Sequence, residues 1–315
     1  MANSGLERAI VTDVTLREYG QNVPERFLPV FTPEIRAEIA LQLIGAGFRN
    51  IEVLSCVHPA IAPAMNRDAV KKTSEKLGRI DGVNLIALVP NRAGYEAFLD
   101  LDLGPDGYDY TMGIFFSAVE AHNLANVGRP IKDTLEEYRM ILNDAASRGI
   151  RVIAYISAAF GYLDPEKGAL TTPYTGTLNG YIDLLFGLGA DLVVLSDLQG
   201  VANEQGTGEI LEGILKGRKR RDIDRLGYHP HHVSREQAIA NSKIAYDLGI
   251  RRFDSSLGGT GGCVTGAPGN QPLEGLIRFF HSVVIDTGIH ERQVLSLAHM
   301  VQRELYSRIT LTESG

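Results

Sequence analysis

The chain has 315 residues, of which 44% are hydrophobic and 22% charged, and its formal net charge is −7. This is ordinary composition for a globular protein, and it argues against nucleic acid as a partner. The one cationic run, Lys216–Arg221, lies between periodic segments and is interpreted as a solvated loop or helix end.

Other compositional features bear on location. No apolar run reaches the roughly 18 residues that a membrane helix needs, so we expect no membrane association. The first residues resemble neither a signal peptide nor a transit peptide. Cys56 and Cys263 are the two cysteines, too few for a disulfide framework. These features together predict a cytoplasmic protein.

Short β-branched runs alternate with longer helical patterns along almost the whole chain. After the first run, Thr32, Pro33 and Glu34 supply an N-cap, a first-turn proline and an early acid for a helix. Several helical patterns end in a glycine that leads directly into the next strand, which is typical of a left-handed C-cap. The eight expected strands are Ala9–Glu18, Asn50–Ser55, Val83–Pro90, Tyr108–Ser117, Arg151–Phe160, Asp191–Asp197, Arg225–His231 and Arg251–Leu257.

Eight strands, each followed by a helical pattern, predict an α/β fold of the (β/α)8 TIM-barrel type. The alternative is an open doubly wound sheet, but no G-x-G-x-x-G motif follows the first run. No linker divides the chain, so we expect one domain over residues 1–315. The barrel would span about 9–285 and a C-terminal helical extension about 286–315. Within that extension, Glu291–Ser307 reads as a helix that packs on the barrel or on a second subunit.

In a TIM barrel the chemistry gathers at the carboxyl ends of the strands. Most of the reactive side chains in this sequence follow that rule, whereas chance would scatter them over both ends. They are Asp13, Arg17, Glu18, Glu52, Glu120, His122, Asn126, Asp197, His229, His231, His232, Cys263 and Asn270.

The strongest single signal is the pair His229 and His231 at the end of the seventh strand. Residues two apart in an extended segment point to the same side, so both imidazoles can reach one ion. Glu18 and Asn270 can add oxygen ligands, and such a mixed set suits Mn²⁺, Mg²⁺ or Zn²⁺. His232 should point the other way. A surface pair of histidines in a loop is the alternative interpretation.

Cys263 lies in a loop with five glycines, a composition that allows close approach to a ligand and movement as a lid. Its thiol could donate a proton or attack a carbonyl, or it could simply be a small side chain in a flexible loop. Cys56 is interpreted as buried filler. Arg17 can neutralise a developing oxyanion, and it can also form a structural ion pair with Asp13 or Glu52.

The segment Asp13-Val-Thr-Leu-Arg17-Glu18 resembles the D-x-x-x-R-[DE] signature of the DRE-TIM metallolyase superfamily. The resemblance runs from about residue 9 to 300. Three features are similar to the HMG-CoA lyase branch: Gln21-Asn22, the pattern IEVLSCVHP, and the glycine loop that contains Cys263. The resemblance implies a metal-dependent enzyme that is often dimeric and that cleaves a 3-hydroxyacyl-CoA to acetyl-CoA and a keto acid.

Carried over residue by residue, the resemblance implies roles for eight positions. Arg17 would lie beside the thioester oxygen, Cys263 would donate a proton, and Glu52 and Asp197 would order the arginine and the polar network. The implied metal ligands are Glu18, His229, His231 and Asn270.

The sequence also departs from the lyase pattern. Glu18 replaces the usual aspartate, Tyr19 a glycine, and His232 the usual Asp or Asn, while the loop from Cys263 to Asn270 is shorter. Two alternatives on the same barrel therefore stay open. One is a synthase that joins acetyl-CoA to a 2-oxo acid, and the other is a metal-dependent aldolase. A degenerate barrel that only binds is a further alternative, although no ligand position has been lost.

Overall fold

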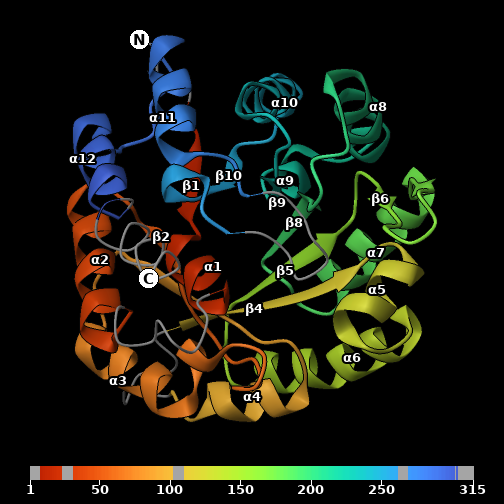
Figure 1. The fold of residues 1–315 in the computed structure, drawn as a ribbon. Coiled ribbons are helices and arrows are strands. Elements are labelled where there is room, and N and C mark those ends of the chain that lie inside the picture. Colours follow the sequence, from red (N-terminus) through yellow and green to blue (C-terminus); the bar gives the residue numbers. More distant parts are fainter. Residues whose placement is uncertain (1–7, 23–30, 102–109, 262–268, 302, 304–315) are drawn as a thin grey trace.

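The computed structural model describes residues 8–22, 31–101, 110–261, 269–301 and 303. Eight parallel strands close into a barrel in the order β1-β10-β9-β8-β5-β4-β3-β2, and helices form a ring around it (Figure 1). The predicted TIM barrel is thereby confirmed. The barrel strands are β1 (Ile10–Asp13), β2 (Asn50–Ser55), β3 (Asn84–Leu88), β4 (Tyr110–Ser117), β5 (Val152–Ser157), β8 (Leu192–Asp197), β9 (Leu226–Pro230) and β10 (Arg252–Ser255).

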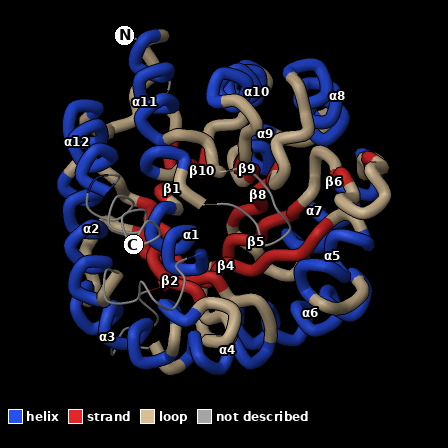
Figure 2. Tube along the Cα trace, in the orientation of Figure 1, coloured by secondary structure: helices blue, strands red, loops and turns tan. Residues whose placement is uncertain are grey.

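Each barrel strand is followed by a helix that packs its apolar face on the outside of the sheet (Figure 2). These helices are α2 (Pro33–Gly45), α3 (Arg67–Leu77), α4 (Arg92–Leu99), α6 (Ile131–Ser147), α7 (Thr175–Gly187), α8 (Glu204–Leu215), α10 (Arg235–Asp247) and α11 (Leu273–Ser282). Thr32 caps α2 as predicted, since its side chain accepts a hydrogen bond from the backbone N–H of Ile35.

Shorter elements fill the connections. They are α1 (Thr15–Asn22), η2 (Pro63–Met65), α5 (Glu120–Val127), the antiparallel pair β6 (Tyr162–Leu163) and β7 (Leu170–Thr171), α9 (Arg220–Ile223) and η3 (Leu257–Gly259). The expected glycine joints are present before four barrel strands, with positive φ at Gly47, Gly149, Gly189 and Gly249.

The first predicted strand was too long. β1 ends at Asp13, and the residues predicted to continue it form helix α1 instead. The Asp13 carboxylate accepts hydrogen bonds from the backbone N–H and the hydroxyl of Thr15, 3.1 and 2.7 Å away. This local capping turns the chain out of the sheet and opens a helix. Arg17 and Glu18 therefore project from a helix above the barrel.

The C-terminal helix α12 spans Glu291–Val301, where the sequence predicted 291–307. It buries Val294, Leu297, Ala298 and Val301 and packs beside α11 and α2. The sequence predicted packing either on the barrel or on a second subunit, and α12 packs on the barrel helices. Contact with a second subunit stays a prediction, as does the division of the chain into a barrel and a C-terminal extension. Among the described residues, no helix has the length and apolar character needed to cross a bilayer.

Candidate active site

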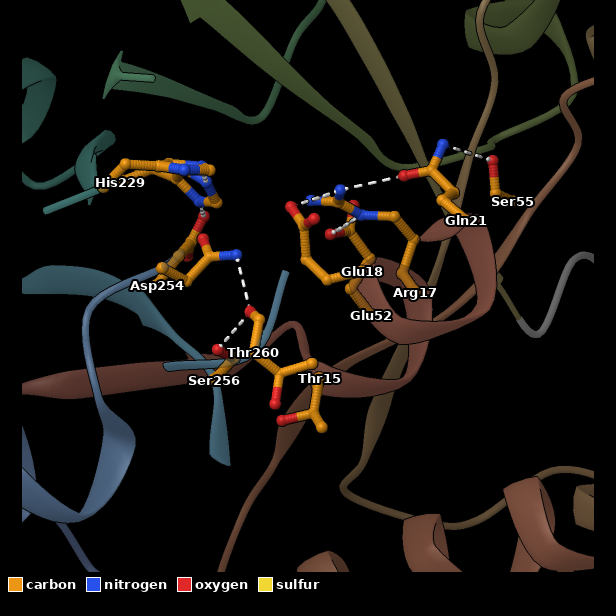
Figure 3. A network of polar contacts seen from close by, with 12 residues as sticks. Thr15, Arg17, Glu18, Gln21, Glu52, Ser55, His229, Asp254, Ser256 and Thr260 are labelled. Carbon is orange, nitrogen blue, oxygen red and sulfur yellow. Dashed lines mark hydrogen bonds and ion pairs between the residues drawn. The ribbon is translucent and has the colours of Figure 1, made fainter. Parts of the chain in front are cut away.

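Helix α1 supplies a buried arginine at the mouth of the barrel. Arg17 is 9% exposed, and its Nε donates to Glu52 Oε2 at 2.7 Å. Its Nη1 donates to Glu18 at 2.5 Å and to Gln21 at 3.0 Å (Figure 3). Burial alone would lower the pKa of Arg17, but the two glutamates outweigh it and raise the pKa above its ordinary value. The guanidinium is therefore a permanent cation in a fixed orientation.

Glu52 binds this arginine and fixes its orientation. Its side chain comes from β2, is fully buried, and reaches the guanidinium of Arg17 (Figure 3). Burial raises the pKa of Glu52, although Arg17 opposes the shift. The predicted ordering of the arginine by Glu52 is thus matched by a direct contact. Gln21 extends the network, since its amide donates to Ser55 Oγ at 3.3 Å.

The two histidines converge as the alternation along a strand predicts. Their Nε2 atoms lie 3.2 Å apart, and both residues are at least 97% buried, with exposures of 3% and 2% for His229 and His231. On its other side, His229 Nδ1 lies 3.1 Å from the carboxylate of Asp254 (Figure 3). That carboxylate fixes the proton on Nδ1, so Nε2 presents a lone pair to the site.

Glu18 completes a cluster with these imidazoles. One ligand atom from each of Glu18, His229 and His231 lies within 4.8 Å of the others. Burial opposes ionisation of Glu18, but Arg17 and both histidines outweigh that cost and lower its pKa. A carboxylate and two imidazole nitrogens are a suitable donor set for a divalent cation.

Asn270 lies at the edge of the cluster. It forms an antiparallel β-bridge with His231, and its amide hydrogen bonds with Glu18. The amide Nδ2 also donates to the carbonyl of Thr260 at 3.0 Å. Gly261 packs so closely here that a Cβ would lie 2.5 Å from Asn270 Nδ2 and 2.7 Å from Glu18 Oε2. Asn270 is next to the cluster as predicted, while its part as a metal ligand stays a prediction.

A cavity of about 120 Å³ opens beside the cluster. Arg17, Glu18, His229 and His231 line it together with four apolar side chains: Ile61, Leu88, Phe115 and Leu198. Its remaining lining is polar or aromatic: Gln21, Asn126, Tyr155, Ser157 and Ser196. The site can therefore bind a ligand that has both oxygen atoms and hydrocarbon.

Comparison with known proteins agrees with this geometry. A model of the HMGL-like family matches residues 8–301. The chain belongs to the HMGL-like family.

Two relatives and one solved structure illustrate how far the likeness of this HMGL-like chain extends. It is 30% identical over 295 residues to hydroxymethylglutaryl-CoA lyase YngG of Bacillus subtilis, covering 93% of each protein. It is 31% identical over 254 residues to the 3-hydroxy-3-isohexenylglutaryl-CoA/hydroxymethylglutaryl-CoA lyase of Pseudomonas aeruginosa, covering 78% of this chain and 77% of that one. A crystal structure of hydroxymethylglutaryl-CoA lyase from Pseudomonas aeruginosa superposes with a TM-score of 0.82 at 27% identity, covering 95% and 94% of the two chains. The resemblance to the HMG-CoA lyase branch is confirmed.

Asp197 borders the cluster of this HMGL-like site through its backbone, since its carbonyl accepts a hydrogen bond from the N–H of His231 at 2.9 Å. Asp197 turns its carboxylate to the backbone N–H groups of Val201 and Ala202, each 3.0 Å away, and burial raises its pKa to about 6. These hydrogen bonds order the turn after β8, and among the described residues Asp197 makes no contact with Arg17. His232 points away from the cluster, as predicted, to the carbonyl of Gly269. Cys263 lies outside the described residues, so its role stays a prediction.

Cys56 is buried, as expected of filler, and burial raises its thiol pKa to about 12. Such a thiol carries almost no thiolate at neutral pH and is chemically inert.

Two residues of the HMGL-like site were missed. Asp254 orients His229, and Tyr155 lines the cavity with its ring centroid 6.1 Å from that of His229. Burial, followed by the charges of Glu52 and Asp254, raises the pKa of Tyr155 well above its ordinary value. The available signal was strand alternation: an acid and a phenol stand at inward positions of strands that are otherwise mostly apolar.

Proposed function

We propose that this protein is a metal-dependent carbon–carbon lyase. It would cleave a 3-hydroxy-3-substituted acyl-CoA of the 3-hydroxy-3-methylglutaryl-CoA type to acetyl-CoA and a keto acid such as acetoacetate. The observation that carries the proposal is the convergence of Glu18, His229 and His231 beside a buried, permanently charged Arg17. Membership of the HMGL-like family and the similarity to hydroxymethylglutaryl-CoA lyases support the same reaction.

A divalent cation fits the residues present. Asp254 holds His229 Nδ1, so the lone pair of Nε2 is directed to the site as a metal ligand. The lowered pKa of Glu18 favours its ionised carboxylate. Glu18, His229 and His231 would hold the ion, and Asn270 is proposed as a fourth ligand. Mg²⁺ and Mn²⁺ suit this mixed set, and Zn²⁺ is also compatible with it. When bound, the ion supplies Lewis acidity that lowers the pKa of the substrate hydroxyl.

The proposed cleavage is a retro-Claisen reaction that needs no further reactant. The 3-hydroxyl proton passes to a base, the C3–O bond becomes a carbonyl, and the C2–C3 bond breaks. Its electron pair moves into the thioester enolate, and C2 then takes up a proton. The candidate bases are Glu18, His229 and Asp197. Both ring nitrogens of His229 would be engaged by Asp254 and the ion, and the Asp197 carboxylate already accepts hydrogen bonds from its own turn, which favours Glu18.

Arg17 is placed to stabilise the enolate oxygen. Its Nε is bound by Glu52, while Nη1 reaches the side of the site that holds Glu18 and Gln21. The orientation is fixed before substrate binds, so no reorganisation is needed during the reaction. A donor of this kind typically lowers a barrier by about 3 kcal/mol. Cys263 is proposed to protonate C2.

The test begins with chelator-treated protein reloaded with Mn²⁺, Mg²⁺ or Zn²⁺ and supplied with 3-hydroxy-3-methylglutaryl-CoA. Acetyl-CoA release that depends on the added metal is expected. A parallel assay with acetyl-CoA and 2-oxo acids should release no free CoA. Steady release of free CoA in this second assay, together with no cleavage of 3-hydroxy-3-methylglutaryl-CoA in the first, would identify a synthase instead.

The two cysteines give a matched pair of variants. Cys263→Ala should lower kcat at least a hundredfold, consistent with loss of a general acid, without weakening Mn²⁺ binding. Cys56→Ala removes the other thiol and should leave kcat within about twofold, because that thiol is buried and protonated. Equal activity of both variants would remove Cys263 from the mechanism.

We also propose a homodimer in the cytoplasm. The dimer rests on the family resemblance, and the location rests on the composition and the small number of cysteines. Light scattering of the purified protein would test the first, and fractionation of the source cells the second.

A further inference from the structure

Two serines lie on the wall of the cavity beside the histidine pair. Ser157 is the last residue of β5 and Ser196 belongs to β8, and both line the cavity. Their exposures are only 5% and 2%. Among the described residues, neither side chain hydrogen bonds with Arg17 or belongs to the metal cluster. The metal site and the arginine therefore leave these two hydroxyls without a function.

The register of the sheet places the serines in one row with His229. Ser196 pairs with His229 across β8 and β9, and paired residues of parallel strands direct their side chains to the same face. The pairing of β5 with β8 runs up to Ile156 and Leu195, so Ser157 and Ser196 are the next neighbours. Adjacent strands lie about 4.8 Å apart. The two hydroxyls and the imidazole thus occupy successive steps of the inner wall.

The hydroxyl groups of this pair have unused hydrogen-bonding capacity. Within the part of the chain that the structure describes, neither Oγ atom has a hydrogen-bond partner. Ser117, which pairs with Ser157 across β4 and β5, is different. Its Oγ accepts from the backbone N–H of Val119 at 3.1 Å and lies 3.4 Å from the carbonyl of Ser157, to which it donates. Because an unpaired buried hydroxyl is costly, two of them on a cavity wall indicate a polar ligand.

The backbone after Ser157 adopts a conformation that few alanines adopt. Ala158 has a φ of +52° and is 1% exposed. The next residue, Ala159, donates its backbone N–H to the carbonyl of Ser196 at 3.0 Å, which ties the end of β5 to β8. Left-handed backbone at a non-glycine residue is strained, and such strain clusters at functional sites. This conformation therefore supports a functional position for the neighbouring Ser157.

We infer that Ser157 and Ser196 bind the terminal carboxylate of the acyl group, which is the C5 carboxylate of a 3-hydroxyglutaryl-CoA. This rests on the proposed lyase function. That function assigns the 3-hydroxyl to the cluster and the thioester oxygen to Arg17, so the C4–C5 arm is the part of the acyl group that still needs partners. Each serine can donate one hydrogen bond, and a carboxylate has one oxygen for each.

The test compares two thioesters that differ only in this carboxylate, on the Mn²⁺-loaded protein. In 3-hydroxy-3-methylbutyryl-CoA a hydrogen replaces the carboxylate of 3-hydroxy-3-methylglutaryl-CoA, so cleavage gives acetone and acetyl-CoA instead of acetoacetate and acetyl-CoA. Acetyl-CoA release gives kcat/KM for each. The glutaryl compound should be preferred at least tenfold, because hydrogen bonds to a charged group are the stronger kind. Equal values would overturn the inference.

Variants locate this preference. Ser196→Ala and Ser157→Ala should each lower kcat/KM for the glutaryl compound about tenfold and leave the butyryl compound within about twofold. Ser196→Thr keeps a hydroxyl and should restore most of the loss. Ser117→Ala is the matched control, because Ser117 lies in the same row but uses its hydroxyl within the protein. Equal losses with both thioesters would assign the serines to a part that the two substrates share, which would overturn the inference.

Binding without turnover gives a second measurement. Isothermal titration of the Mn²⁺-loaded protein uses two free acids, 3-hydroxy-3-methylglutarate and 3-hydroxy-3-methylbutyrate. Ser196→Ala should raise the Kd of the diacid about tenfold and leave the Kd of the monoacid unchanged. A diacid Kd equal to that of wild type would overturn the inference.

The two proposals fail in different ways. If folded protein binds Mn²⁺ but releases acetyl-CoA from neither thioester, the lyase function is wrong and the carboxylate subsite falls with it. If both thioesters are cleaved with the same ratio in wild type, Ser157→Ala and Ser196→Ala, the lyase function stands and the subsite is wrong.

Discussion

Removal of Asp254 should weaken metal binding without unfolding the barrel. Its carboxylate lies 3.1 Å from His229 Nδ1, and the two side chains are 5% and 4% exposed. A carboxylate in this position fixes the tautomer and raises the basicity of the imidazole, so its loss typically costs 10–100-fold in metal affinity. Asp254→Asn keeps the shape but lets the ring rotate and change tautomer. We expect the Kd for Mn²⁺ to rise by that factor, equivalent to about 1.4–2.7 kcal/mol.

Isothermal titration of chelator-treated protein with Mn²⁺ measures this change directly. Asp247→Asn serves as the control, because Asp247 is an exposed acid that pairs with Lys243 on α10. Circular dichroism should show both variants folded at the titration temperature. An Asp254→Asn protein that binds Mn²⁺ as tightly as wild type would refute the proposed orientation of His229, and with it the argument that Nε2 is the metal-binding nitrogen.

Further predictions concern backbone packing and pH. Gly261→Ala would place a Cβ 2.7 Å from Glu18 Oε2 at a φ of +111°, so titration should show Mn²⁺ affinity reduced at least tenfold. In Gly47→Ala the new Cβ would lie 2.2 Å from a backbone oxygen, so the free energy of unfolding measured in urea should fall by about 3 kcal/mol. Gly149→Ala has open space around the new Cβ and should lower the free energy of unfolding by only about 1 kcal/mol. Burial raises the pKa of Asp13 from 3.8 to about 7, although the hydrogen bonds that Asp13 accepts from Thr15 oppose the shift. Wild type should therefore lose stability as pH rises from about 4 to 7, and Asp13→Asn should gain up to about 3 kcal/mol relative to wild type between pH 5 and pH 8 in urea unfolding. If the stability difference between wild type and Asp13→Asn is the same at pH 5 and at pH 8, the raised pKa of Asp13 is contradicted.

The periodic spacing of apolar residues along the sequence was sufficient to predict most of the fold. Strand and helix alternation is a local property of the sequence, and each glycine joint marks a left-handed residue between them. The same alternation placed His229 and His231 on one side, and the structure brings their Nε2 atoms to 3.2 Å. The first strand was predicted too long, because the turn at Asp13 depends on a side-chain cap. Such a cap competes with the extended chain and leaves no mark in the pattern of apolar residues.

Contacts across the barrel were harder to foresee. Asp254 and His229 are 25 residues apart and meet because β10 lies beside β9. Sequence spacing gives the face of a strand, but the register between strands decides which inward side chains meet. Asp197 shows the same limit: its place at the end of a strand was visible in the sequence, whereas the hydrogen bonds that its two oxygens accept from the following turn were not.

The Glu18 carboxylate serves two neighbours at once. Its Oε1 accepts from Arg17, while Oε2 faces the Gly261 and Asn270 side of the cluster. Projecting from the first turns of α1, a side chain one methylene shorter would have to give up one of these contacts or draw the helix inward. The extra length needs space above it, and Gly261, which has no Cβ, leaves that space. We therefore expect Glu18 to depend on the glycine at position 261, and the loss of Mn²⁺ affinity predicted for Gly261→Ala tests this dependence.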